Sequence, residues 1–296
     1  MNVLSLFDGI SCGQQALVKA GIGYDTYISS EIEKAAINCT NSNFPKTVQM
    51  GDVCGLSSKS LPKIDLLIGG SPCQGFSFAG KQLNFNDTRS KLFFEYVRLL
   101  DELSPKYFLL ENVRMTKDCE QVISEYLGVA PVMINSALFT AHDRKRLYWT
   151  NIKFDDIVPT YNLVIRDILD EHPEGSLFLS NAASSRYMSN PNFIKDNRKS
   201  CVVGKLSKYQ GDRVFHVDCK ASSLSASGGN NGGGGCNLIH NPEDGRIRRL
   251  SVPECARLQG VAPSYLDGMK RSSAYKALGN GWTVDVIAHI FKGING

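Results

Sequence analysis

The first half of the chain alternates short apolar segments with amphipathic ones, and this alternation constrains the fold more than any other feature. Helical segments such as 14–20, which ends at Gly21, and 92–103 lie between candidate strands. Alternation of this kind predicts a mostly parallel sheet with helices on both faces. The candidate strands are 2–7, 24–29, 47–50, 64–68, 107–110, 132–135 and 147–151.

The alternation stops near Asp155, which indicates a second and smaller domain. The tract 228–235 contains six glycines, and these cannot belong to a regular element. Residues 272–291 resume the helical pattern and are expected to return to the first domain. With 296 residues, the chain is long enough for one large and one small domain. The expected division is 1–160 plus 265–296 for the larger domain and 161–264 for the smaller.

Bulk composition excludes several classes of protein without selecting one. A net charge of +4 and a pI near 8.5 are too mild to indicate nucleic-acid binding by themselves. The nine cysteines form no C-x2-4-C pair, so we expect reduced thiols, no disulfide framework and no metal site. No apolar run approaches the length of a membrane span, and the amino terminus lacks a signal-peptide pattern. We therefore expect a cytoplasmic protein with no membrane partner.

The segment Gly69-Gly70-Ser71-Pro72-Cys73-Gln74-Gly75 is the strongest candidate for chemistry. It follows the apolar run 64–68, which places Cys73 in a turn at the carboxyl end of a strand. Open α/β sheets bind their ligands at that end. A proline before the cysteine fixes the backbone, and flanking glycines let a planar substrate approach a thiolate nucleophile. An isolated loop cysteine is more often only a small apolar residue, so the motifs around it decide.

The segment from Phe7 to Gly13 begins a nucleotide-type βαβ unit. A strand, a glycine loop, a helix and an acid about twenty residues later also describe dinucleotide-binding folds. This loop has only Gly9 and Gly13, whereas a pyrophosphate site normally has three spaced glycines. With Phe7 beside it, the loop better suits a ligand without phosphates, such as S-adenosylmethionine.

Pro72-Cys73-Gln74 resembles the nucleophile motif of the DNA cytosine-5 methyltransferases, and further blocks follow in that family's order. The resemblance covers nearly the whole chain, except roughly 155–245. Leu147-Tyr148-Trp149 and Gly279-Asn280-Gly281-Trp282 are most similar to the branch that contains mammalian de novo enzymes and some phage or bacterial ones. The other blocks are Phe7–Gly13, Glu31, Gly51–Val53, Glu111–Val113, Arg144–Arg146, Arg248–Gly260 and Gly279–Val284.

The resemblance implies an α/β, Rossmann-like methyltransferase domain with a smaller target-recognition domain. S-adenosyl-L-methionine is the implied cofactor, and S-adenosyl-L-homocysteine is the product. Phe7 would pack on the adenine ring, Glu31 would accept the ribose hydroxyls, and Asp52 would accept the adenine amino group. The methionine carboxylate would lie near the amino terminus of the first helix. The other implied cofactor contacts are Asp8, Gly9, Gly13, Val53, Pro72, Asn280 and Trp282.

The resemblance also implies four catalytic residues. Cys73 would add to carbon-6 of cytosine, and Glu111 would hydrogen-bond ring nitrogen 3 and the exocyclic amine. Arg144 and Arg146 resemble the pair that supports the cysteine loop and reaches the carbonyl oxygen of the base. His142 stands where many members have glutamine, and we assign no role to it.

A base inside a duplex cannot reach such a site, so the target must be flipped out. The loop 78–89 is the candidate lid. Seven Lys or Arg against two Asp between Arg186 and Arg213 suit DNA phosphates. The glycine-rich tract 222–235 resembles the family's recognition loops. Expected DNA contacts are Gln74, Ser77, Lys81, Arg89, Lys205, Lys208, Ser227, Gly228 and Gly229.

We therefore expect a DNA cytosine-5 methyltransferase that acts on double-stranded DNA as a monomer in the cytoplasm, associated with the nucleoid through DNA. A cognate restriction endonuclease as partner and the target sequence stay open. One rival is a tRNA cytosine methyltransferase on the same fold, although its Cys-Phe-Thr signature is absent. Another is a catalytically inactive DNA-binding relative, against which the intact Cys73 and Glu111 argue.

Overall fold

The computed structural model of the chain describes residues 1–71, 88–155, 160–194, 201–206, 212–226, 237–240 and 244–295. These residues form two compact units. Unit 1 comprises Met1–Asn135, Lys145–Asp156 and Val286–Gly296. Unit 2 comprises Ser136–Arg144 and Ile157–Asp285.

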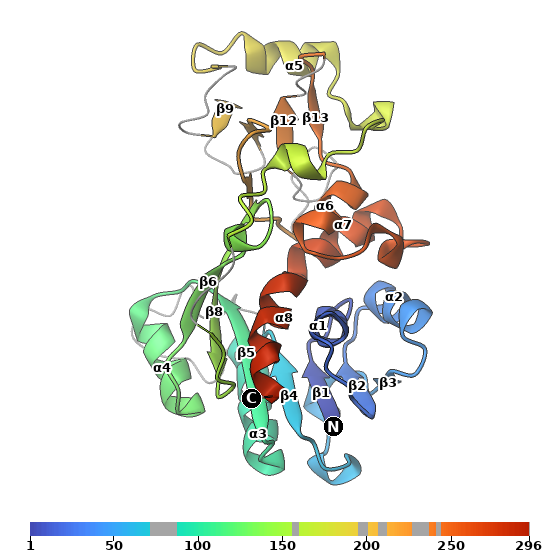
Figure 1. The fold of residues 1–296 in the computed structure, drawn as a ribbon, viewed down its shortest axis with the longest axis vertical. Coiled ribbons are helices and arrows are strands. Elements are labelled where there is room, and N and C mark those ends of the chain that lie inside the picture. The colour runs from blue at the N-terminus through green and yellow to red at the C-terminus, as the bar shows by residue number, and fades with distance from the viewer. Residues whose placement is uncertain are drawn as a thin grey trace. The chain divides into compact units, whose positions relative to one another are not determined.

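Unit 1 is built on a seven-stranded sheet with the strand order β3-β2-β1-β4-β5-β8-β6 (Figure 1). The first five strands in this order pair in parallel, whereas β8 runs antiparallel to both β5 and β6. The expectation of a mostly parallel α/β sheet is therefore confirmed. The strands are β1 (Asn2–Leu6), β2 (Thr26–Ser30), β3 (Val48–Gln49), β4 (Leu66–Gly69), β5 (Tyr107–Val113), β6 (Val132–Asn135) and β8 (Lys145–Thr150).

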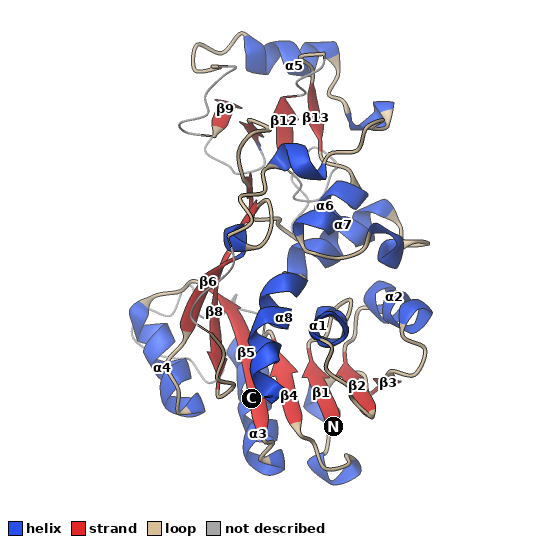
Figure 2. Cartoon of the chain, viewed as in Figure 1, coloured by secondary structure: helices blue, strands red, loops and turns tan. Residues whose placement is uncertain are grey.

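Helices cover both faces of this sheet (Figure 2). The first helix ends where the sequence predicts, because Gly21 adopts a left-handed φ of 71° and its N–H caps the last turn. The helices are α1 (Cys12–Ala20), α2 (Lys34–Asn43), α3 (Thr88–Leu103), α4 (Lys117–Leu127) and α8 (Val284–Phe291), the last of which begins in unit 2. Short 3-10 turns are η1 (Val53–Gly55), η2 (Ser58–Ser60) and η8 (Lys292–Asn295).

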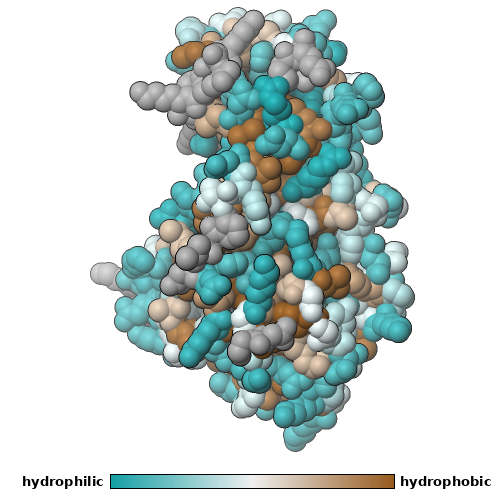
Figure 3. All heavy atoms as spheres, viewed as in Figure 1, coloured by the Kyte–Doolittle hydropathy of each residue, from teal (hydrophilic) through white to brown (hydrophobic). Residues whose placement is uncertain are grey.

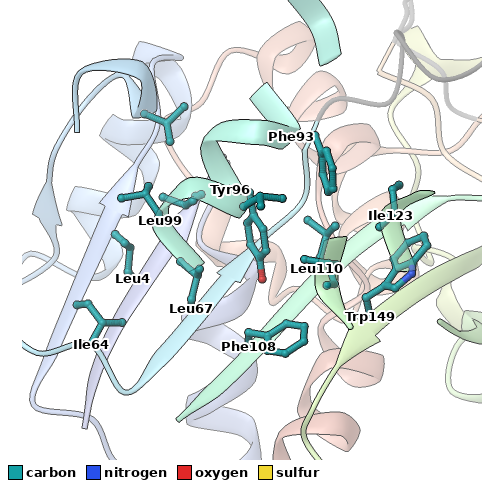
Figure 4. Packing of buried hydrophobic residues seen from close by; sticks show 14 of the residues in the cluster. Leu4, Ile64, Leu67, Phe93, Tyr96, Leu99, Phe108, Leu110, Ile123 and Trp149 are labelled. Carbon is teal, nitrogen blue, oxygen red and sulfur yellow. The ribbon is translucent and has the colours of Figure 1, made fainter. Parts of the chain in front are cut away.

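The main core of unit 1 lies between α3, α4 and the sheet (Figure 4). Tyr96 of α3 and Trp149 of β8 are fully buried there, and the indole N–H of Trp149 donates to the Ser124 hydroxyl at 2.9 Å. Gly69, at the end of β4, lies against the Tyr96 ring, and a Cβ at Gly69 would be 2.9 Å from Tyr96 Cδ2. The close packing fixes the strand end from which the Cys73 segment departs.

Unit 2 contains a four-stranded sheet with the order β13-β12-β10-β9 and a separate two-stranded ladder of β7 and β11. A small core of Tyr187, Val203, Val214, Leu238 and Ile247 covers the larger sheet. The strands are β7 (His142–Asp143), β9 (Val202–Lys205), β10 (Arg213–Phe215), β11 (Ala221–Ser222), β12 (Leu238–His240) and β13 (Ile247–Arg249). The helices are α5 (Asn181–Met188), α6 (Val252–Leu258) and α7 (Arg271–Asn280), with 3-10 turns η3 (Ser136–Leu138), η4 (Ile165–Ile168), η5 (Gly175–Leu177) and η7 (Pro263–Leu266).

The two units and the two expected domains have different boundaries. Residues 136–144 and 265–285, expected in the larger domain, belong to unit 2. The units are groups of residues in mutual contact, whereas the expected domains were drawn from the sequence pattern and the motif blocks. The functional division therefore stays a prediction.

A buried ion pair organises the connection from β13 to α6. Both guanidinium Nη atoms of Arg248 donate to the Glu254 carboxylate, at 2.8 and 2.9 Å, and the two side chains are 1% and 0% exposed. Ser251 and Glu254 form a capping box at the start of α6. Burial alone would raise the pKa of nearby Asp170, but hydrogen bonds from Ser251 and Arg257 outweigh burial and lower that pKa.

The cysteines depart from expectation at one pair. Cys201 and Cys219 form a disulfide in unit 2, so the prediction of reduced thiols throughout is wrong here. The two residues are 18 positions apart, and the turn after β10 brings them together, with the His216 N–H donating to the Cys201 carbonyl. The spacing of the cysteines along the sequence does not indicate that these two residues pair. The other described cysteines are thiols, and burial raises the pKa of Cys39 to about 11.

The surface, the helices and the arrangement of possible metal ligands were compared with what membrane and metal-binding proteins need. Polar side chains with small apolar groups between them cover the face shown in Figure 3. Within the described part of the chain, no helix has the length and apolar character needed to cross a membrane. The described ranges also hold no group of three or more His, Cys, Asp or Glu arranged to bind a metal ion.

Candidate active site

The strand register of unit 1 places the predicted site residues along one edge of the sheet. Leu6 of β1 pairs with Ser30 of β2 and with Gly69 of β4. Gly69 in turn pairs with Leu110 of β5. The next residue along each strand therefore lies in a row at the carboxyl edge, and adjacent strands are about 4.8 Å apart. These residues are Phe7, Glu31, Gly70 and Glu111.

This row crosses the point at which the order of the strands along the sheet reverses. From β1 the chain adds β2 and β3 on one side and then places β4 on the other. Ligands of open α/β sheets bind in the crevice outside the strand ends at such a switch point. Phe7 follows β1 and Gly70 follows β4, so the predicted cofactor loop and the Cys73 segment leave the sheet from adjacent strands.

The predicted cofactor loop after β1 is a tight turn stabilised from inside. Phe7, Gly9 and Ser11 have left-handed φ values of 57°, 59° and 52°. The buried Asp8 carboxylate accepts hydrogen bonds from the Tyr27 hydroxyl, at 2.7 Å, and from the Ser11 hydroxyl. Burial raises the pKa of Asp8, although these hydroxyl groups oppose the shift. Asp8 thus shapes the loop, and its direct contact with a cofactor stays a prediction.

Glu31 ties the cofactor loop to the segment before α2. Its Oε2 atom accepts from the Gly9 N–H at 2.7 Å, and its Oε1 atom accepts from the N–H groups of Ile32 and Glu33 at 2.8 Å each. The neighbouring Ile32 is 72% exposed. The sequence analysis did not select Ile32.

Asp52 follows β3 at the same edge. Its Oδ1 atom accepts from the Cys54 N–H at 3.0 Å and caps η1. The preceding Gly51 has a φ of 72°, and its carbonyl accepts from the Ser30 hydroxyl at 2.7 Å. Asp52 is exposed and Val53 is buried. The structure thus brings Asp52 to the end of β2, next to Glu31.

Glu111 and Arg146 meet across β5 and β8. In this antiparallel pair Val113 lies opposite Arg146, and Arg146 Nε lies 3.0 Å from Glu111 Oε1. The side chains are only 14% and 10% exposed for Arg146 and Glu111. The geometry is that of an ion pair without a hydrogen bond, and Oε1 has no hydrogen-bond partner among the described residues. The lone pairs of Oε1 are thus available to a donor from water or from a ligand.

Asn112 links β5 to the segment that leads to Cys73. Its Nδ2 atom donates to the Ser71 carbonyl at 3.3 Å, and its Oδ1 atom accepts from the Val113 N–H at 2.8 Å. Both Asn112 and Ser71 are buried. The sequence analysis quoted Asn112 only as part of a motif and assigned no function to it. The structure shows a contact between β5 and Ser71, two residues before Cys73 in the sequence.

Several predicted residues lie outside the described residues and stay predictions. Arg89 is in the first turn of α3, but its side chain is among those left undescribed. The others are Pro72, Cys73, Gln74, Ser77, Lys81, Lys208, Ser227, Gly228 and Gly229.

Arg144 is not placed beside Glu111 by the contacts that the structure describes. Its Nη1 atom donates to Ser223 and Leu224, and its Nη2 atom donates to the carbonyls of Gly279 and Gly281. All these partners belong to unit 2, as does Arg144 itself. The expected role of Arg144 at the cytosine ring therefore gains no support from these bonds.

The remaining predicted residues occupy three places. Gly9 and Gly13 belong to the turn and helix after β1, and Gly13 is buried. Asn280 is exposed at the last position of α7, and Trp282 is buried in the turn between α7 and α8. Gln259 stabilises this turn by donating to the Leu278 carbonyl at 2.7 Å and accepting from the Thr283 hydroxyl at 2.8 Å. Lys205 is exposed at the end of β9.

Comparison with known proteins gives a consistent result. The family model for the C-5 cytosine-specific DNA methylase matches residues 1–296. The Type II methyltransferase M1.ScrFI of Lactococcus lactis subsp. cremoris is 31% identical, and the match covers 88% of this chain and 69% of that protein. The orphan methyltransferase M.SPRI of Bacillus phage SPR is 39% identical, but the match covers only 52% of this chain and 38% of the phage protein.

Solved structures confirm the fold. The crystal structure of the S. pombe Dnmt2 methyltransferase aligns with a TM-score of 0.75 and covers 100% of both chains. Its sequence identity is 19%, so the likeness concerns the fold alone.

Proposed function

This chain belongs to the C-5 cytosine-specific DNA methylase family, and from that premise we propose that it transfers a methyl group from S-adenosyl-L-methionine to carbon-5 of cytosine in duplex DNA. One observation carries the proposal at the level of the site. The buried Oε1 atom of Glu111 lacks a hydrogen-bond partner in the described part of the chain and lies beside the Arg146 guanidinium. An exocyclic amine of a flipped base is a donor that suits it.

The proposed mechanism begins with activation of the base. Carbon-5 of cytosine is too electron-poor to attack a methyl group unaided. The Cys73 thiolate adds to carbon-6, while Glu111 hydrogen-bonds ring nitrogen 3 and the exocyclic amine and stabilises the developing charge. S-adenosylmethionine, when bound, supplies the sulfonium methyl group that carbon-5 takes. Solvent water then accepts the carbon-5 proton, the electron pair of that C–H bond re-forms the double bond between carbon-5 and carbon-6, and the Cys73 sulfur leaves carbon-6 as a thiolate.

Arg146 is proposed to orient Glu111 and to donate a hydrogen bond to the carbonyl oxygen of the base. Its Nε atom faces Glu111, and its Nη1 atom donates to the Lys145 carbonyl at 2.9 Å, so the guanidinium plane is held from two sides. A rigid fork of donors suits a planar substrate. Asn112 is proposed to position the Cys73 segment through its bond to Ser71.

The residues at the carboxyl edge fit S-adenosylmethionine. The left-handed turn of Phe7, Gly9 and Ser11 brings backbone N–H groups to the start of α1, where a carboxylate is favoured. Glu31 already accepts three N–H groups, and its remaining lone pairs suit ribose hydroxyls. The exposed Ile32 offers an apolar surface for the adenine ring. S-adenosylhomocysteine would leave from the same site.

We extend the proposal to the setting of the enzyme. Duplex DNA is the proposed partner, the monomer is the proposed active form, and the cytoplasm is the proposed location, next to the DNA. Where a cognate restriction endonuclease is encoded, it would cut the same sites when they are unmethylated.

A transfer assay tests this function directly. Purified protein with methyl-labelled S-adenosylmethionine should label duplex DNA and leave tRNA unlabelled. The Cys73→Ser variant is the control, because a hydroxyl is far less nucleophilic than a thiol near neutral pH. Label in tRNA without label in DNA would assign the chain to the rival activity. Equal labelling of DNA by the Cys73→Ser variant would contradict the mechanism.

A further inference from the structure

The segment Ser222–Ala226 of unit 2, which we name the anchored segment, is held by a set of buried polar groups that the proposed chemistry does not use. β11 leads into this segment and pairs in parallel with β7, with Ala221 beside His142 and Ser222 beside Asp143. The Ala221 N–H also donates to the Ala141 carbonyl at 2.7 Å. The fully buried His142 ring accepts from the Leu224 N–H through Nε2 at 3.0 Å. His142, which received no role from the sequence, thus extends the ladder beyond β11.

Arg144 continues this contact and adds a second partner. Its Nη1 atom donates to the Ser223 hydroxyl at 3.2 Å and to the Leu224 carbonyl at 3.3 Å. Its Nη2 atom donates to the carbonyls of Gly279 and Gly281 at 3.3 and 2.9 Å. One buried guanidinium therefore joins the anchored segment to the carboxyl end of α7 and the residue after it, Gly279–Gly281, which we name the turn 279–281. The rigid fork of arginine allows this, whereas a lysine ammonium is a single point of charge.

Gly279 touches the anchored segment directly. A Cβ at Gly279 would lie 2.5 Å from the Ala226 nitrogen and 2.5 Å from the Ser225 carbonyl carbon. Both are backbone atoms, so no side chain can rotate away to make room. The glycine is needed here because two backbones are in contact, and any larger residue must displace the anchored segment.

Asn237, which follows the glycine-rich tract 222–235, is hydrogen-bonded to Ser222, the first residue of that tract. Its Nδ2 atom donates to the Ser222 carbonyl at 2.9 Å, and its Oδ1 atom accepts from the Ser222 N–H at 3.2 Å. Asn237 is 5% exposed, and its carbonyl accepts from the Leu250 N–H at 3.1 Å. Residues 222 and 237 are thus joined side by side, which fixes where the chain between them begins and ends.

We infer that Arg144 is a positioning residue for target selection, which sets the anchored segment against the turn 279–281 and thereby determines which cytosines are modified. The inference rests on the proposed function, because it takes the tract that begins at Ser222 to contact DNA. In this account Arg144 does not touch the base. Its loss should change the choice of site more than the rate of the chemical step.

The test compares methylation maps from Arg144→Lys and from the wild type. Each protein is expressed in bacteria without cytosine-5 methylation, and plasmid DNA is sequenced after bisulfite conversion. The readout is the ratio of methylation at the sites preferred by the wild type to methylation at all other cytosines. A partly unfolded population lowers both terms alike, so the ratio reports positioning alone. Arg166→Lys is the matched control, since Arg166 is a half-exposed arginine of unit 2 paired with Asp218.

We expect the ratio to fall roughly tenfold or more in Arg144→Lys, the scale of one lost charge-assisted hydrogen bond. Arg166→Lys should keep the wild-type ratio. Gly279→Ala is the second variant, because it displaces the anchored segment while Arg144 itself is kept, and its ratio should fall too. S-adenosylhomocysteine affinity, measured by calorimetry on Arg144→Lys, should change much less than the ratio.

Two outcomes would overturn the inference while leaving the proposed function intact. One is a wild-type ratio in both Arg144→Lys and Gly279→Ala. The other is a uniform loss of methylation at all cytosines in both variants while urea unfolding shows both to be as stable as the wild type, which would give Arg144 a general or catalytic role. If the wild type itself methylates no DNA, the proposed function fails, and this inference fails with it.

Discussion

Replacing Glu254 by glutamine should destabilise unit 2 by about 3–5 kcal/mol, the cost of removing one partner of a buried ion pair. The carboxylate is 0% exposed and accepts from both Nη atoms of Arg248, from the Ser251 N–H and from the Asp170 N–H. Glutamine removes the charge and turns an amide group toward these donors. Arg248, which is 1% exposed, would then be a buried cation without its counter-charge.

The matched control is Asp244→Asn in the same unit. Asp244 pairs with Arg246, but their side chains are 34% and 53% exposed, so this loss should cost about 0–1 kcal/mol. Urea unfolding followed by circular dichroism gives the free energies of unfolding. Hydrogen exchange of the α6 amides shows whether the loss is local, because two compact units need not unfold together. A cost for Glu254→Gln below about 1 kcal/mol, equal to the control, would refute the reasoning.

Two further predictions concern the cofactor loop. Glu31→Ala and Asp52→Ala should both weaken S-adenosylhomocysteine binding in calorimetry. Glu31→Ala should do so more strongly, because Glu31 also accepts a hydrogen bond from the Gly9 N–H. Unchanged affinity in both variants would contradict the assignment of Glu31 and Asp52 to the cofactor site. For Asp8, burial raises the pKa above its ordinary value of 3.8, so its contribution to stability is present below about pH 4 and is lost as pH rises through the folded-state pKa. Asp8→Asn should therefore gain stability relative to the wild type as pH rises in urea titrations, and a difference that does not vary with pH would contradict the burial argument.

The strands of unit 1 were predictable because their signals are local. Expected segment 2–7 corresponds to β1 (Asn2–Leu6), and the helix after it ends at Gly21 as predicted. The bounds of several strands differ from the expected ones by one or two residues, and β5 differs most, since residues 107–110 were expected and the strand continues to Val113. Glu111 and Asn112 have poor strand propensity, but their pairing with β8 overrides it. The strands of unit 2 are two to four residues long, too short to show a period.

The site residues also divide into those that local motifs located and those whose contacts only the structure shows. Motifs located Glu31, Glu111 and Arg146, because each signal is carried by a few consecutive residues. The bond from Asn112 to Ser71 spans 41 positions, and the bonds of Arg144 span 79 to 137. The Cys201–Cys219 disulfide likewise depends on a turn that the sequence did not reveal. Contacts between distant segments follow from the folded topology, which local patterns do not report.

Trapping the enzyme on DNA tests the central claim most directly. Duplex DNA with 5-fluorocytosine at the target has no carbon-5 proton to lose, so the bond between Cys73 and carbon-6 should persist after methyl transfer. With S-adenosylmethionine, the wild type should give a denaturation-resistant complex, and mass spectrometry should place the adduct on the peptide that contains Cys73. Cys73→Ser should give none, and Glu111→Gln should trap more slowly by a factor on the order of 10²–10⁴. An adduct on any of the other eight cysteines, or robust methylation by Cys73→Ser, would contradict the account.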